Sequence, residues 1–401
     1  MQEYFKSERT VKRIIHAAAI ILSVIFLFIG NRLTQREPIF AQYGGSTRYF
    51  TAVVTEITRR EAVNIAFSWD SPRPGISIDF YARVTSGARR GDIVHANQEL
   101  YDGFMFDYPE ITLGDRVMIV HDAFNNLYFF NGFARFSYAL ILGVVLFAAI
   151  IAFARFKGLN AIVALAFTCL AVFFIFVPAI LTGRNIYVAT LIVSVYAIVS
   201  TLVIVIGANK KALSAMLGCL GGVLTAATLM LVVSRVANLL GFFGNNRSLL
   251  HLPLDSYIDL QALVFAGVIL GAVGAIMDVA MSIASSLWEL REAGGVTDFR
   301  SIFTSGVNIG KDILGTMLNT LILAYIGSSL TLILLIAAFT TSYTALLNEE
   351  LIVVEFFRAI VGSFGMLLTI PLTAAVCGWL YGTPSALANR ADDDAVFYEE
   401  Y

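Results

Sequence analysis

Charged residues are scarce in this sequence, and their scarcity excludes most classes of soluble protein. Of its 401 residues, 14% are charged, whereas soluble domains carry about 25%. The formal net charge of -2 leaves no basic excess for a nucleic-acid surface. Apolar residues make up 58% of the chain instead, and the mean hydropathy is +0.78. Several runs exceed the roughly 18 apolar residues typical of a spanning helix, so we expect a polytopic protein of the lipid bilayer that binds no nucleic acid.

Reactive side chains are also few. The three cysteines, Cys169, Cys219 and Cys377, lie in apolar runs and have no metal-ligand spacing. None of the four histidines neighbours a nucleophile, and the chain has no phosphate-binding loop and no zinc motif. The sequence therefore predicts no metal, no cofactor and no enzymatic activity.

The first segment, residues 1–33, reads as a membrane anchor. Four basic residues, ending at Arg13, precede the apolar run Ile14–Gly30. No small-x-small cleavage site follows this run, which favours an uncleaved helix over a signal peptide. By the positive-inside rule, the basic N-terminal end is expected in the cytoplasm.

Residues 34–132 differ in character, because apolar and polar residues alternate as they do in half-buried strands. Gly91-Asp92 and Gly114-Asp115 each supply turn chemistry that leads into a predicted strand. We expect a small all-β domain, either an OB-like barrel or a sandwich. Because it follows an inward-to-outward anchor, it should be extracytoplasmic, where it would serve positioning or gating and could hold a protein partner.

Residues 133–383 predict an all-α membrane domain of seven spans. In chain order the spans are Phe136–Phe153, Ala161–Leu181, Ile186–Ile206, Ala212–Val233, a helix from Asp259, a helix ending near Phe339, and Leu351–Tyr381. With the anchor this gives about eight transmembrane helices in the cytoplasmic membrane. Both termini are then cytoplasmic, including the acidic tail at residues 384–401.

The fourth of these spans carries small residues on one face: Ser214, Gly218, Gly221, Gly222 and Thr225. Such a face is typical of close helix packing in membranes. We expect it to pack against the two polar helices that follow.

Those two helices carry polar residues where a span should carry none. On the first, one face holds Asp278, Ser282, Ser285 and Ser286. On the second, one stripe holds Asn308, Asp312, Thr316, Asn319 and Thr320. A carboxylate inside a span costs about 2.5 to 3.5 kcal/mol on insertion scales, which favours a functional site. The hydroxyls and amides are equally typical of helix packing, and Asp312, next to Lys311, equally suits a capping or solvated role.

Glu355 and Arg358 are spaced i, i+3 near the outer end of the last span. Charges inside spans usually pair with one another, so an ion pair is one interpretation and a gate is the other.

Two stretches, GAVGAIMDVAMSIASSLWELRE and SGVNIGKDILGTMLNTLILAYIGSSL, resemble the YibE/F family of bacterial multispan membrane proteins. The resemblance implies one anchor, an outer domain and a helical membrane domain. The layout is also similar to that of the RND exporters and SecDF proteins, in which an intramembrane aspartate takes up protons; Asp278 would match it. This sequence departs from that layout in having two more spans, one small outer domain and a single acid.

An aspartate among neutral oxygens suits Na⁺ or a proton better than a soft metal. The first hypothesis is therefore a secondary transporter that couples an ion or proton to movement of a small ion or solute, with its site formed by Asp278 and the Asn308–Thr320 helix. The alternative is a non-transporting scaffold or accessory protein whose outer β domain binds a partner.

Overall fold

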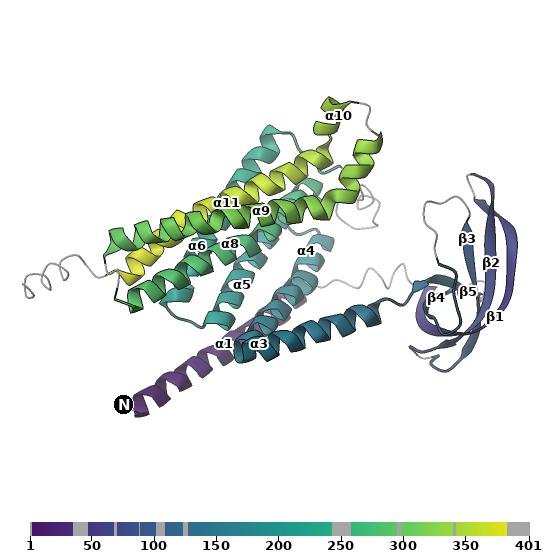
Figure 1. Cartoon of the computed structure of the whole chain (residues 1–401), viewed down its shortest axis with the longest axis horizontal. Helices are drawn as coiled ribbons and strands as arrows, with labels where there is room; N and C mark the ends of the chain where they lie inside the picture. Colours follow the sequence, from purple (N-terminus) through teal and green to yellow (C-terminus); the bar gives the residue numbers. More distant parts are fainter. Residues whose placement is uncertain are drawn as a thin grey trace, which may run out of the picture. The chain divides into compact units, whose positions relative to one another are not determined.

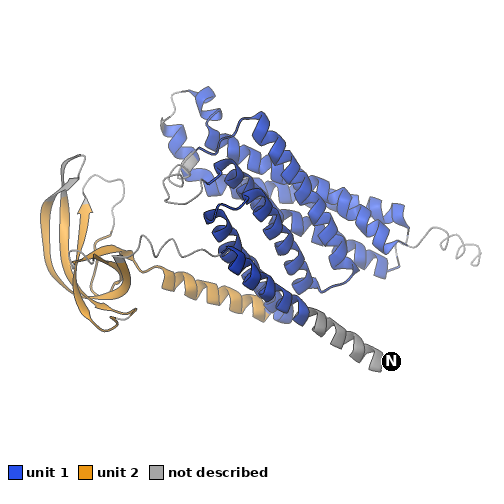
Figure 2. Cartoon of the chain, turned by 180° about the vertical axis from the view of Figure 1, so that it is seen from behind, with its two compact units in different colours: residues 1–36, 153–401 blue, residues 37–152 orange. Residues whose placement is uncertain are grey.

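The computed structural model describes residues 2–34, 47–67, 70–87, 89–101, 109–122, 127–242, 258–294, 298–339 and 342–382 (Figure 1). The chain forms two compact units, residues 37–152 and residues 1–36 together with 153–401 (Figure 2). The predicted acidic tail, residues 384–401, lies outside the described residues.

The smaller unit contains a closed five-stranded barrel. Its strands are β1 (Thr47–Phe67), β2 (Asp70–Val84), β3 (Ile93–Tyr101), β4 (Arg116–Asp122) and β5 (Leu127–Phe133). They pair in the order β1-β2-β3-β5-β4, and β4 pairs with β1 to close the barrel. Strands β3 and β5 are parallel, and the other neighbouring strands are antiparallel. Alternate residues such as Ile78, Phe80 and Ile119 fill the interior. Of the two predicted all-β folds, the barrel is therefore confirmed and the sandwich is not.

Both Gly-Asp pairs lead into strands as predicted. Gly91 has φ +102° and Gly114 has φ +88°, in the region that favours glycine. The amide of Gly91 donates to the Val84 carbonyl at 2.9 Å, and that of Gly114 donates to the Val54 carbonyl at 2.9 Å. Strands β3 and β4 begin within two residues of these turns.

The larger unit is helical. The helices are α1 (Gln2–Thr34), α3 (Phe136–Ala171), the π-helix η1 (Val172–Phe176), α4 (Val177–Leu181), α5 (Ile186–Ile206), α6 (Lys210–Val236), α8 (Leu260–Glu292), α9 (Phe299–Phe339), α10 (Tyr343–Leu347) and α11 (Glu350–Tyr381). Asn185, Asn209 and Asp259 cap α5, α6 and α8 by accepting hydrogen bonds from backbone amides. Helix α3 crosses from the smaller unit into the larger one.

Seven helices in the described part of the chain are long and apolar enough to cross a membrane. One of them, Phe136–Leu181, has 46 residues, or about 69 Å at the rise of an α-helix, roughly twice the thickness of a bilayer core. Arg155 interrupts it with a non-helical backbone, φ 49° and ψ -125°. The predicted count of eight treats this stretch as two spans and stays a prediction.

The core of the larger unit lies between α6, α8 and α11. The expectation that the glycine face of α6 packs against the two polar helices was wrong in the main. Gly218 and Gly221 lie against Thr373 and Leu372 of α11, and only Gly222 also approaches α8, at Ile276. A small-residue face selects a close neighbour, but its period does not say which helix that neighbour is.

Candidate functional site

Asp278 lies in the interior of α8, on the face that the other described helices leave open. It is about 27 Å along the axis from Leu260 and about 21 Å before Glu292. Gly271, Gly274 and Asp278 are exposed, whereas Ile276 and Val279 on the other side are fully buried. A Cβ atom at Gly274 would meet nothing within 4 Å. Asp278 forms no ion pair within the described residues.

Ser282, Ser285 and Ser286 are half-buried and continue the Asp278 face toward the Glu292 end of α8. From Asp278 to Ser286 the face runs for about 12 Å. One helix by itself therefore presents a carboxylate followed by three hydroxyls. These are hard oxygen groups, suited to a proton or an alkali cation. No group of three or more His, Cys, Asp or Glu side chains that could hold a metal ion occurs in the described ranges.

The stripe on α9 is open in the same way. Its members are all exposed: Asn308, Asp312, Thr316, Asn319 and Thr320. The opposite side of α9, at Gly306, Gly310 and Leu321, is buried. Thr316 and Thr320 donate to carbonyls of their own helix, at 2.9 and 3.0 Å. Among the described residues, no hydrogen bond or ion pair joins this stripe to Asp278 or to the serines of α8.

Glu355 and Arg358 form an ion pair on α11. Nη1 of Arg358 donates to both carboxylate oxygens, at 2.8 and 3.0 Å. The side chains are only 13% and 24% exposed. Arg358 lies about 12 Å along α11 from Glu350, whose carboxylate accepts from the amides of Leu240 and Gly241 and so fixes that end of the helix.

Tyr325 of α9 completes the cluster around this pair. The Arg358 guanidinium carbon is 5.9 Å from the centre of its ring, within range of a cation–π interaction. Two glycines of α8 leave the space: a Cβ at Gly267 would be 3.5 Å from Nη2 of Arg358, and a Cβ at Gly271 would be 3.1 Å from the Tyr325 hydroxyl. Within the described residues, that hydroxyl and Nε of Arg358 are buried without a hydrogen-bond partner.

The sequence did not single out Tyr325. It lies on the packed side of α9, away from the polar stripe, where an aromatic residue is typical of a core. The available signal was the pair Gly267 and Gly271, one helical turn apart, which marks a place where a neighbour approaches α8 closely.

Together these groups form a line along one face of α8. Arg358 and Tyr325 lie against Gly267 and Gly271, Gly274 is bare, and Asp278 and the serines follow. From Gly267 to Ser286 the line is about 29 Å long, close to the roughly 30 Å of a bilayer core. Polar groups thus lie at both ends of this line, and the face between them is open at Gly274.

A family model described as YibE/F-like protein matches residues 142–383. The chain belongs to the YibE/F-like family. The matched region of this YibE/F-like chain runs from α3 to the end of α11, so it contains the whole α8 line and the α9 stripe, and leaves out the barrel. Family membership and the apolar helices fit a multi-pass membrane protein. No curated protein and no solved structure matches the chain.

Proposed function

We propose that this protein is a secondary transporter of the cytoplasmic membrane, with both termini cytoplasmic, that couples an ion or proton at Asp278 to the movement of a small ion or solute. The observation that carries the proposal is the α8 line, in which polar side chains from Asp278 to Ser286 are followed by bare glycines that lead to Tyr325 and Arg358 of the neighbouring helices. If the ion pair between Glu355 and Arg358 were only structural, it would not need the glycines and polar side chains that extend from it along α8. A path for a small polar species would need the whole line.

In this proposal Asp278 is the group whose charge changes. A lone carboxylate in hydrocarbon is expensive, so it is neutralised by a proton or by a cation held between the carboxylate and the serine hydroxyls. The buried unpaired groups on Tyr325 and Arg358 supply hydrogen-bond donors on the same path. Their donor character suits water or an anionic solute near the outer end.

The test is thermal stability of the purified chain against Na⁺, Li⁺, K⁺ and pH, comparing the wild type with Asp278→Asn. A ligand at a hundred times its dissociation constant stabilises the folded state by about 2.7 kcal/mol. We expect one cation, or a change of pH, to shift the melting temperature of the wild type and not that of Asp278→Asn.

Asp298→Asn is the matched control. Asp298 precedes α9, its carboxylate accepts from the Ser301 amide at 3.0 Å, and asparagine caps equally well. The control should keep the ion response, and proteoliposomes holding the wild type or the control should take up that ion. Absence of any response in the wild type would reject the coupling site and favour the scaffold whose outer barrel holds a partner.

A further inference from the structure

A large cavity lies between α1, the η1–α4 segment and α5, away from the α8 line. Its volume is about 940 Å³, within the size range of small-molecule sites. Helix α1 contacts its neighbours at several places. Gly30 packs directly on Ile175, and Phe26 stacks on Tyr196 with ring centres 4.2 Å apart. At the end of α1, Arg184 donates to the Leu33 carbonyl.

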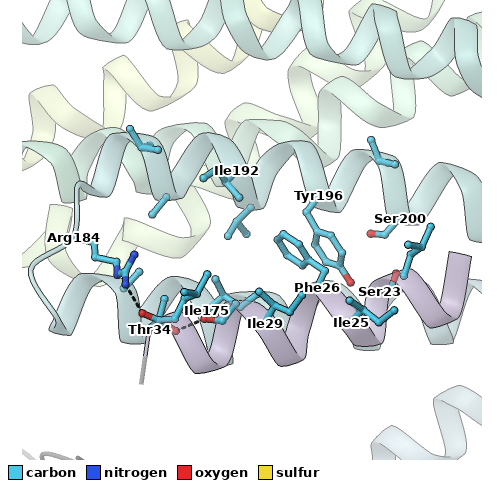
Figure 3. Close-up of a pocket in the computed structure, with 18 of the residues that line it drawn as sticks. Ser23, Ile25, Phe26, Ile29, Thr34, Ile175, Arg184, Ile192, Tyr196 and Ser200 are labelled. Atoms are coloured by element: carbon cyan, nitrogen blue, oxygen red, sulfur yellow. Dashed lines mark hydrogen bonds between the residues drawn. The ribbon is translucent and has the colours of Figure 1, made fainter. Parts of the chain in front are cut away.

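The chemistry of the walls changes from one end to the other (Figure 3). Arg184 and Thr34 lie at one end, and Ser23, Tyr196 and Ser200 lie at the other. Between them the walls are aliphatic, as at Ile29 and Ile192. Along α5, the distance from Asn185 to Ser200 is about 22 Å, most of the depth of a bilayer core.

We infer that this cavity binds one membrane phospholipid with an anionic headgroup. An acyl chain fits the aliphatic walls, and the phosphate lies at Arg184. The guanidinium has five N–H donors in a planar fork, and the described contacts use it for one carbonyl, that of Leu33. Its remaining donors match phosphate oxygens, and such charge-assisted bonds are stronger than those to a neutral headgroup. A zwitterionic lipid would fill the walls equally well but would bring no net negative charge.

The test is native mass spectrometry of the full chain released from nanodiscs that contain equal amounts of phosphatidylglycerol and phosphatidylcholine. We expect the wild type to retain phosphatidylglycerol with a preference of about tenfold, the ratio that one charge-assisted contact can supply. Arg184→Gln should abolish the preference but not lipid retention. Ala189→Trp, which fills the cavity, should reduce retention of both lipids.

Arg235→Gln is the control, because Arg235 is an exposed arginine near the end of α6 that does not line the cavity. It should behave as the wild type does. Equal retention of the two lipids by the wild type would overturn the inference, as would a preference that survives in Arg184→Gln or is lost in Arg235→Gln.

A separate observation concerns the polar stripe of α9. The stripe lies within Phe299–Thr331, a segment apolar enough to span a membrane, yet its side chains are exposed. Asn308, Asp312 and Asn319 have no hydrogen-bond or ion-pair partner among the described residues. Amides and a carboxylate left against lipid tails would be costly, so a polar surface must cover them.

The geometry points to a second copy of this chain as that cover. Amides and hydroxyls both donate and accept, so the stripe is complementary to itself. Lys311 and Asp312 are adjacent and both exposed. In a two-fold pair with its axis along the membrane normal, equal depths meet, and Lys311 of each copy faces Asp312 of the other. Gly315 lies within the stripe, and its bare backbone permits close approach.

The test measures mass and cross-linking. The detergent-purified wild type should have the mass of a dimer by light scattering. In a background without Cys169, Cys219 and Cys377, Asn319→Cys should cross-link in membranes, whereas Leu224→Cys, exposed on α6, should not. Gly315→Leu should halve the mass without lowering the melting temperature by more than a few degrees, because a Cβ there meets nothing within 4 Å of the same chain.

A monomeric wild type in both detergent and membranes would overturn this inference. So would a dimer that neither cross-links at Asn319→Cys nor responds to Gly315→Leu. The α8 line contains no residue of the α9 stripe. A Gly315→Leu variant that is monomeric but keeps the ion response of the wild type would therefore show that dimerisation and the proposed ion site are independent.

Discussion

Replacing Gly222 with valine should destabilise the folded protein by about 3 kcal/mol, the upper part of the usual range for overpacked cores. A Cβ atom at this position would overlap Oγ1 of Thr369. It would also lie 3.0 Å from the Gly365 carbonyl oxygen and 3.1 Å from Cγ2 of Ile276. Thr369 can rotate, but the carbonyl belongs to the α11 backbone, so relief requires separation of two helices. Reversible unfolding in mixed micelles measures the loss.

Gly274→Val is the matched control for this prediction. Both glycines lie inside long helices, so the change in helix propensity is the same, but a Cβ at Gly274 meets nothing within 4 Å. Its cost should stay below about 1 kcal/mol. The conservative Gly222→Ala should be partly rescued by Thr369→Ala, which removes the nearest obstructing atom. Equal stability of Gly222→Val and Gly274→Val would contradict the close crossing of α6 and α11.

The features that sequence reasoning predicted well depend on signals a few residues long. Asp259 was expected to begin a helix and caps α8, because an aspartate side chain reaches the amide three residues on. The Gly-Asp turns before β3 and β4 follow from glycine's access to positive φ. The polar faces of α8 and α9 follow from the helical period alone. Each of these predictions depends only on the sequence within one helix or turn, and not on how helices or strands pack together.

What the sequence left open was the direction in which each face points. A period of 3.6 residues shows which side chains share a stripe, but it does not predict which neighbouring helix that stripe faces. The glycine face of α6 therefore could not be assigned to α11, and the α9 stripe could not be placed on the side away from its packed face. Tyr325 was missed for the same reason, since its role comes from Arg358 of one helix and Gly271 of another.

Arg358→Met should cost about 3 kcal/mol of stability, the lower end of the range for breaking a buried ion pair, because both side chains keep some exposure. Methionine preserves most of the volume but removes the donors at 2.8 and 3.0 Å from the Glu355 carboxylate. The loss comes mainly from leaving that carboxylate without its cation. Unfolding in mixed micelles, at a pH where exposed carboxylates are ionised, measures it.

Glu355→Gln combined with Arg358→Met decides what the pair does. Removing both charges leaves no uncompensated group, so the double variant should recover to within about 1 kcal/mol of the wild type. If the pair only holds α11 in place, such a variant keeps any ion uptake that the wild type shows. If the pair gates the α8 line, the double variant is as stable as the wild type, but its rate of ion uptake differs from that of the wild type. A double variant as unstable as Arg358→Met would contradict the ion-pair account, because Arg358 would then stabilise the fold through its packing on Tyr325 and Gly267 and not through Glu355.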